Sequence, residues 1–284
     1  MCRMRGLALC ALLAGCYFQS GQATDDAAGS GSDAPADVMI DAPARLVDRG
    51  LVVRYFVAEA ASGNAPPSLV DTAPEPLDLP ITYTPKLAYT EDSGHRGLSW
   101  SAAMSDNARA DIAVAGTKIA QQLAGRTQWT IEVVYDVETI PSGVDARIVT
   151  ISTGTVGYGT ATLLTSDRLH ANVEVNGLGT AWPVDETKGR IVVHAVVNTT
   201  ASGAGQRVQV YVGGAPMING GGTAPNPGVG LALTATDHLS IGNVDTGGRS
   251  FVGKIYYAAF YNVALSQAEV VANAAALASD DDHP

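Results

Sequence analysis

The 284-residue chain has few positive charges and few aromatic side chains, and both shortages narrow the range of its functions. Lys and Arg number 17 against 28 Asp and Glu, so the formal net charge is −11. Nucleic-acid phosphates bind to cationic faces, and this balance therefore argues against a nucleic-acid partner. Aromatic residues make up 6% of the chain, which is lean for a carbohydrate groove built from aromatic platforms.

Cysteine is also scarce, and the three cysteines all lie near the N-terminus, at Cys2, Cys10 and Cys16. The same region has two arginines followed by the apolar run 6–14. That order is typical of a secretory signal peptide, and the run is too short to span a bilayer as a helix. Cleavage before Cys16 leaves one cysteine, so we expect no intramolecular disulfide in the exported protein.

The sequence "LAGC" at positions 13–16 resembles the lipobox of bacterial lipoproteins. In that class the chain is cut before the cysteine, which then carries lipid. The resemblance implies that residues 1–15 are removed and that lipid on Cys16 anchors the exported protein to a membrane. An Asp after the cysteine often retains such proteins in the inner membrane, so Tyr17 favours the outer membrane, on its periplasmic face or at the cell surface. The alternative is an ordinary signal peptide with an incidental cysteine.

Acidic segments of low hydrophobicity flank the region that we expect to fold. Residues 21–43 contain five Asp and no Lys or Arg. Such a composition buries too little apolar surface to offset the entropy lost on ordering. We therefore predict a disordered acidic tether over 16–48, a folded domain over 49–277 and an acidic tail over 278–284.

Short runs rich in β-branched and aromatic residues follow one another through the domain and are separated by turn formers. With 31 Gly and 14 Pro in the chain, this pattern predicts an all-β sandwich or barrel. Gly213-Gly214 lies between two apolar runs and indicates a tight hairpin. Residues 253–261 are typical of a last strand that is buried on both faces. Ser266 and Glu269 then have the spacing of a capping box before a short C-terminal helix.

Four stretches together resemble the laminin G-like domains of the concanavalin A-like lectin and glucanase superfold. They are GLVVRYFVAEAASG (50–63), WTIEVVYDV (129–137), VQVYVGG (208–214) and the final segment 239–270. The resemblance implies a jelly-roll β-sandwich of two antiparallel sheets, one of them concave. It is compatible with a binding domain and with a polysaccharide-active enzyme, because the superfold contains both classes.

Three carboxylates share one face of the strand expected over 129–140, namely Glu132, Asp136 and Glu138. Some glycosidases of this superfold use acids on such a strand, but Val134 stands where the first acid should be. Glycosidases need a fixed separation between two carboxyl groups, so we predict that the protein is not an enzyme. We expect the carboxylates to line a solvated face, and we take them as candidate ligand-binding residues. Trp182, which we expect to be exposed, is the further candidate.

Oxygen-bearing side chains in two loops provide the single cofactor hypothesis, which is calcium. The resemblance implies calcium at the rim of the domain, held by an Asp and loop carbonyls, and hard cations prefer oxygen ligands. The candidate ligands are Asp106, Asn243 and Asp245. The alternative is that these residues are turn formers, which the absence of EF-hand-like spacing favours. We expect no other cofactor.

Three functions therefore stay open at the level of sequence. The first is a lipid-anchored domain that binds a carbohydrate or an envelope protein without catalysis. The second is a glycoside hydrolase or lyase of the concanavalin A-like fold. The third is a structural envelope lipoprotein. The incomplete acid pattern favours the first and the third over the second, and we predict the first.

The lipid anchor can be tested at Cys16. A Cys16→Ser variant should leave the membrane fraction and become soluble, because the atom that carries the lipid is lost. Fractionation followed by immunoblotting of wild type and variant measures this change. Retention of the variant with membranes would contradict the lipoprotein assignment.

Overall fold

The computed structural model describes residues 45–57, 65–101, 106–140, 145–154, 159–218 and 221–281. All of these belong to one compact unit that spans residues 42–284. Cys16 and residues 16–44 of the predicted tether lie outside the described residues. No helix within the described ranges combines the length and the apolarity that crossing a membrane requires.

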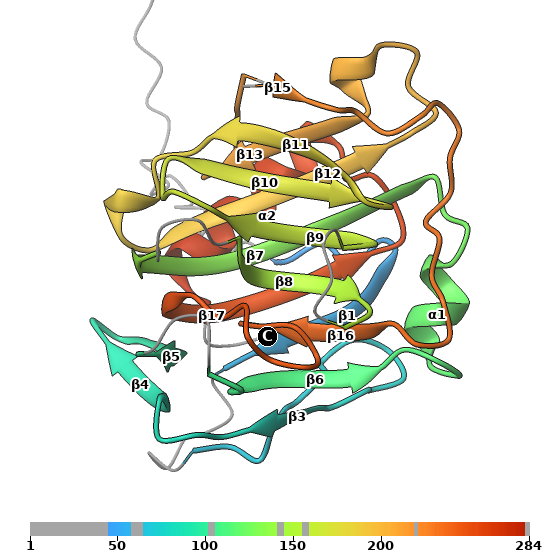
Figure 1. Cartoon of the computed structure of the whole chain (residues 1–284). Coiled ribbons are helices and arrows are strands. Elements are labelled where there is room, and N and C mark those ends of the chain that lie inside the picture. Colours follow the sequence, from blue (N-terminus) through green and yellow to red (C-terminus); the bar gives the residue numbers. More distant parts are fainter. Residues whose placement is uncertain are drawn as a thin grey trace, which may run out of the picture. The chain divides into compact units, whose positions relative to one another are not determined.

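The described strands form two antiparallel sheets (Figure 1). The first sheet has the order β14 (Ala215–Pro216), β13 (Val208–Val212), β12 (Ile191–Asn198), β7 (Gln128–Thr139), β17 (Val252–Tyr261), β5 (His95–Trp100) and β4 (Leu87–Asp92), and β1 (Leu51–Phe56) also pairs with β17. The second sheet has the order β15 (Gly221–Gly222), β11 (Leu178–Pro183), β10 (His170–Val175), β9 (Ala161–Thr165), β8 (Ala146–Ser152), β16 (His238–Ile241), β6 (Arg109–Ala113), β3 (Leu79–Thr82) and β2 (Ser68–Leu69). The described helical elements are α1 (Lys118–Leu123), α2 (Gln267–Ser279) and the short 3-10 helices η1 (Glu186–Lys188) and η2 (Ala204–Gln206).

The two sheets enclose the main core, and Figure 1 shows β9, β8 and β6 in front of β7 and β17. Alternation along the strands supplies the core side chains, because successive residues point to opposite faces. Ile131 and Val133 of β7 meet Ile151 of β8 and Leu163 of β9 in this core. The predicted all-β jelly-roll sandwich of two antiparallel sheets with a short C-terminal helix is confirmed.

Strand β17 lies inside the first sheet and is buried on both faces, as predicted. Ala258 and Phe260 enter the main core, whereas Tyr257 and Tyr261 face the opposite side. Strict alternation would place Ile255 with Tyr257, but Ile255 also enters the main core. The pairing register shifts between these two residues, and such a β-bulge adds a residue that reverses the alternation.

The hairpin at Gly213-Gly214 forms as predicted and joins β13 to β14. Both glycines have positive φ, 56° and 82°, a conformation that residues with a Cβ rarely adopt. Val212 and Ala215 pair across the turn, so the connection has two residues. Strand β14 is at the edge of the first sheet, where Pro216 is tolerated.

Helix α2 begins with the predicted capping box. Ser266 Oγ accepts a hydrogen bond from Glu269 N, and Glu269 Oε2 accepts one from Ser266 N at 2.7 Å. Arg49 lies 2.6 Å from the same carboxylate, and its hydrogen bond lowers the pKa of Glu269 to about 2. The helix packs Val270 and Leu277 into a second apolar cluster on the outer face of the first sheet.

The residues just before β1 belong to the fold, although the sequence pattern placed them in the tether. Leu46 and Val47 pack against the cluster beneath α2. Val47 N donates a hydrogen bond to Asn273 Oδ1 of the helix at 2.8 Å. Leu46 and Val47 directly follow an acidic segment, so the local sequence did not indicate that they are ordered. The residues that they contact are in α2, near the other end of the chain.

A buried carboxyl group, Glu186 in η1, bonds to residues of the sandwich. Tyr135 Oη donates to Glu186 Oε1 at 2.6 Å, and Thr165 Oγ1 donates to Oε2. Burial raises the pKa of Glu186 to about 7, and the two hydrogen bonds offset only part of this effect. The folded protein therefore keeps a proton on Glu186 at pH values where the unfolded chain has lost it.

The raised pKa of Glu186 predicts a pH-dependent stability. The unfolded carboxyl ionises near pH 4.5 and the folded one near pH 7, so its contribution is complete below pH 4.5 and is lost as the pH rises to about 7. Glu186→Gln does not titrate. Its free energy of unfolding relative to wild type should therefore increase by roughly 3 kcal/mol over this interval.

Urea unfolding of both proteins on either side of this pH interval measures the change. Glu138→Gln, at the exposed end of β7, is the control and should show no comparable trend. A difference between Glu186→Gln and wild type that is independent of pH would contradict the raised pKa.

Candidate functional site

The three predicted carboxylates lie on β7 and share the face that points away from the main core, as alternation predicted. Their surroundings differ along the strand, because Glu132 is fully buried, Asp136 is half-buried and Glu138 is exposed. Glu138 lies 3.9 Å from Lys254 Nζ. The expectation of one solvated face is therefore wrong, since helix α2 covers the part of the strand around Glu132.

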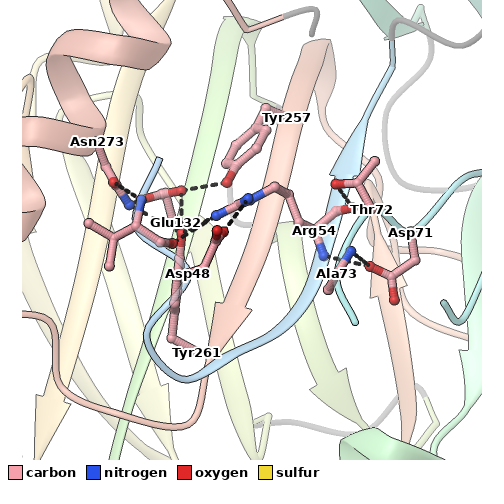
Figure 2. Close-up of polar contacts among 10 residues, drawn as sticks. Asp48, Arg54, Asp71, Thr72, Ala73, Glu132, Tyr257, Tyr261 and Asn273 are labelled. Carbon is pink, nitrogen blue, oxygen red and sulfur yellow. Dashed lines mark hydrogen bonds and ion pairs between the residues drawn. The ribbon is translucent and has the colours of Figure 1, made fainter. Parts of the chain in front are cut away.

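Glu132 is at the centre of a polar network beneath α2 (Figure 2). Its Oε1 accepts hydrogen bonds from Tyr257 Oη at 2.6 Å and from Tyr261 Oη at 3.1 Å. Its Oε2 accepts one from Asn273 Nδ2 at 2.6 Å and lies 2.8 Å from His194 Nε2. These partners come from β17, α2 and β12, and they are buried as well. The carboxylate is thus shielded from any substrate in solution.

The protonation of Glu132 follows from this environment. Burial alone would raise its pKa, because a charged carboxylate loses its hydration. The attraction and hydrogen bond of His194, with hydrogen bonds from Tyr257 and Asn273, outweigh that effect and hold the pKa of Glu132 below its ordinary value. Burial raises the pKa of Tyr257 well above its ordinary value, and the negative charge of Glu132 adds to this. The pair therefore stays as an ionised carboxylate with a protonated tyrosine donor.

Arg54 of β1 extends the network toward the start of the folded unit, as Figure 2 shows. Its Nη2 donates to Val47 O at 2.8 Å and lies 3.4 Å from Tyr261 Oη. Its Nη1 pairs with Asp48 at 2.8 Å, and its backbone N donates to Asp71 Oδ1 at 2.9 Å. The network therefore connects segments that are distant in sequence, and the burial of Glu132 and its partners gives it a structural role.

Trp182 was expected to be exposed, and the structure contradicts this. Its relative exposure is 2%, and its side chain belongs to the main core. Trp182 pairs with Ala171 across β11 and β10, and alternation turns both side chains toward the other sheet. Trp182 and Glu132 are thus buried on opposite sides of the first sheet and do not meet in one site.

The three predicted calcium ligands lie near one another, but one of them is already used. Asn243 is buried and donates through Nδ2 to the backbone oxygens of Asp106 and Ala108 at 2.8 and 3.2 Å. Its Oδ1 accepts from the backbone nitrogens of Val244 and Arg249 at 3.0 and 2.7 Å. In the part of the chain that the structure describes, no three His, Cys, Asp or Glu side chains gather as a metal site. Asn243 Oδ1 is therefore engaged in organising its loop, and calcium binding at these residues stays a prediction.

A polar row crosses five neighbouring strands of the second sheet, and sequence analysis did not identify it. Its members are Asp111 (β6), Ser240 (β16), Thr150 (β8), Thr162 (β9) and Glu174 (β10). Each member is paired with the next across adjacent strands. Their neighbours Leu239, Ile151 and Leu163 enter the main core, so the row faces away from it.

Gly159 covers the part of the polar row formed by Thr150, Thr162 and Glu174. Its backbone N donates to Glu174 Oε2 at 2.7 Å, and Arg147 Nη1 pairs with the same oxygen at 3.2 Å. The hydroxyls of Thr150 and Thr162 bond to each other at 2.6 Å. A Cβ on Gly159 would lie 1.7 Å from Thr162 Oγ1, so a larger residue would displace this cover.

The end of the polar row at β6 is more accessible. Asp111 lies 3.1 Å from His238 Nδ1 and 2.9 Å from Arg109 Nε, with side-chain exposures of 15%, 30% and 19% in that order. Next to them, the buried hydroxyls of Ser240 and Ser152 have no hydrogen-bond partner among the described residues. These hydroxyls are enclosed, so the groups open to a ligand at this end are the partly exposed side chains of Asp111, His238 and Arg109. A partly exposed carboxylate on a rigid strand suits the hydroxyl groups of a sugar.

Comparisons with known proteins place this fold among β-sandwiches. A scan of protein-family models and a search of curated proteins return no match. Trypanosoma rangeli sialidase in complex with the inhibitor DANA has a TM-score of 0.54 and 14% identity, over 79% of this chain and 32% of that chain. The same sialidase in complex with 2,3-difluorosialic acid has a TM-score of 0.51 and 15% identity, over 80% and 33%. The binding domain of botulinum neurotoxin DC in complex with SialylT has a TM-score of 0.54 and 8% identity, over 79% and 50%.

The chain therefore spans about a third of the sialidase chain and half of the neurotoxin chain that it resembles. At these identities the likeness establishes a shared β-sandwich fold and no more. The laminin G-like resemblance is confirmed only at this coarser level.

The prediction that the protein is not an enzyme is contradicted. It rested on Val134 at the place of a catalytic acid, but the solved structures with this fold include a sialidase, which is an enzyme. An incomplete acid pattern on one strand is therefore no ground for excluding catalysis in this fold. The burial of Glu132 shows that this particular carboxylate is inaccessible, and it says nothing about other groups.

The structural role of Glu132 can be measured. Glu132→Gln replaces an acceptor oxygen by a donor amide and leaves buried donors unpaired, so the free energy of unfolding should fall by about 3–5 kcal/mol. Glu138→Gln, exposed on the same strand, should change it by about 0.5 kcal/mol or less. Urea unfolding of the two variants gives both values. Equal and small effects would show that the network contributes little.

Proposed function

We propose that this protein is an exported lipoprotein whose β-sandwich binds a sialylated carbohydrate. The observation that carries the proposal is the fold shared with the neurotoxin binding domain in complex with SialylT, at a TM-score of 0.54. The sialidase complex with 2,3-difluorosialic acid supports the same class of ligand. The class of ligand is proposed from the fold likeness, and the position of the binding surface is proposed from the residues of this chain.

The accessible end of the polar row, around Asp111 and His238, is the binding surface in this proposal. Helix α2 closes the outer face of the first sheet over Glu132, whereas the second sheet presents polar side chains away from the core. Asp111 provides an acceptor, and the side chains of His238 and Arg109 beside it are partly exposed. Sugar recognition depends on such fixed polar groups, since each sugar hydroxyl both donates and accepts.

The lipid on Cys16 would hold this domain at the outer membrane, on its periplasmic face or at the cell surface. The lipobox resemblance at positions 13–16 supports the anchor, and Tyr17 supports the outer membrane. The laminin G-like resemblance supports a glycan ligand and equally an envelope protein as partner. The glycan is the stronger candidate, because the neurotoxin binding domain with the same fold is in complex with SialylT.

A second candidate function is hydrolysis of the bound glycan, and the fold shared with a sialidase favours it. Glu132 is excluded as the catalytic acid by its burial, and Asp136 and Glu138 differ in exposure on the same strand. A hydrolytic site would therefore use other groups than the dyad that sequence analysis considered.

Glycan binding by the full-length protein tests the proposal. We expect wild type to bind sialylated glycans on an array, and Asp111→Ala to weaken binding about tenfold or more, because hydrogen bonds to a charged group are lost. Glu138→Ala, on the first sheet, removes one negative charge elsewhere and serves as the control.

Repeating the array measurement with calcium and with a chelator tests the metal hypothesis. Incubation of the protein with a fluorogenic sialoside tests whether it hydrolyses the glycan.

The outcomes separate the parts of the proposal. Unchanged binding by Asp111→Ala would place the binding surface away from the polar row. Failure of the wild type to bind any glycan on the array would contradict carbohydrate binding itself.

A further inference from the structure

A carboxylate near the end of the described chain is inserted into a cationic and aromatic site. Asp281 follows α2, and its side chain is fully buried although Ser279 and Asp280 are exposed. Its Oδ1 lies 2.6 Å from His95 Nδ1. Its Oδ2 lies 2.7 Å from both Nε and Nη2 of Arg190. Both carboxylate oxygens are therefore bound by side chains from other parts of the fold.

Arg190, just before β12, is held in place independently of Asp281. Its Nη2 donates to the backbone oxygen of Leu277 in the last turns of α2. Its guanidinium carbon lies 5.8 Å from the ring centroid of Tyr256. A cation is stabilised both by the carbonyl end of a helix and by an aromatic face. The guanidinium should therefore keep its orientation when the carboxylate leaves.

His95 and Tyr256 form the rest of the site on two paired strands. The rings of His95, at the start of β5, and Tyr256, in β17, meet edge to face with centroids 6.2 Å apart. Gly97 leaves room for the tyrosine, since a Cβ there would lie 3.0 Å from its ring and 2.9 Å from Ile255 O. His95 and Tyr256 thus belong to strands and Arg190 directly precedes one, whereas the carboxylate belongs to the segment after the last helix.

We propose that His95 and Arg190, supported by Tyr256, form a carboxylate site that binds an acidic sugar in exchange for Asp281. The site lies at the surface, with side-chain exposures of 25% for His95 and 19% for Arg190. The carboxylate of Asp281 has the same chemistry as that of sialic acid and occupies the site in its place. The choice of a sugar acid over other carboxylates rests on the proposed function.

The charge of the whole chain makes a local cationic site valuable for an acidic ligand. The formal net charge is −11, so an anion approaches the protein against a net repulsion. An Arg guanidinium with two nitrogens on a carboxylate gives a strong, oriented contact that a single lysine does not match. Arg190 supplies that contact, and His95 binds the second oxygen.

Occupation by Asp281 lowers the apparent affinity for any ligand of the carboxylate site. When the competing side chain fills a site for roughly 90–99% of the time, the apparent affinity is weaker by about 10- to 100-fold. Asp281→Ala should therefore bind an acidic sugar about 10- to 100-fold more tightly than wild type.

Calorimetric titration of full-length wild type and Asp281→Ala with N-acetylneuraminic acid, and with its methyl ester, tests the proposal. The acid should bind the variant more tightly, and the ester should gain nothing because it lacks the charged group. Glu138→Ala removes one negative charge from another part of the first sheet and should behave as wild type. Arg190→Gln added to Asp281→Ala should abolish the gain.

A second measurement covers the case in which Arg190→Gln unfolds the end of α2. The imidazole resonances of His95 in Asp281→Ala should shift on addition of the acid and stay in place with the ester.

Equal affinity of wild type and Asp281→Ala for the acid, or an equal gain for the ester, would overturn the proposal. Asp281 would then only fix the end of α2 to the first sheet. In that case binding of wild type to the glycan array would still support the proposed function. A gain for the acid without any array binding would support the carboxylate site alone.

Discussion

The packing of α2 on the first sheet depends on one buried carboxylate, that of Glu132 in β7. Removing an ionised group from water costs several kcal/mol, and this cost is offset only when hydrogen-bond donors surround it. The donors come from three elements, with His194 on β12, Tyr257 on β17 and Asn273 on α2. The donors act together, because the loss of one leaves the buried charge less fully compensated. The network therefore holds the last helix and the start of the folded unit on the first sheet.

The packing of α2 over Glu132 makes the outer faces of the two sheets different. The helix turns the outer face of the first sheet into a second core, so the carboxylate that resembles a catalytic acid in sequence is structural. Polar groups for a ligand are left on the second sheet, at the accessible end of the polar row. The same helix ends beside Arg190 and delivers Asp281 to the carboxylate site. The proposed carboxylate site thus follows from where α2 packs.

The correct predictions came from interactions within a few residues. Gly213-Gly214 forms its hairpin because the required φ values suit glycine whatever surrounds it. The capping box of Ser266 and Glu269 joins neighbouring residues and is equally local. Alternation along β7 correctly placed Glu132 opposite the core side chains, but it contains no information on what covers each face. For the same reason Trp182 was assigned to the surface, although its partner sheet buries it.

The sequence by itself determined the all-β class and the turn and cap positions, because each depends on local composition or on periodicity along one strand. Tertiary structure alone decided which polar residues meet. The polar row needs the register of five strands, since its members are spread from Asp111 to Ser240. The carboxylate site needs His95, Arg190 and Asp281, which lie far apart in the chain and are brought together by the packing of α2 on the first sheet. Distances between residues remote in sequence are set by the pairing and packing of whole elements, and a linear pattern does not encode them.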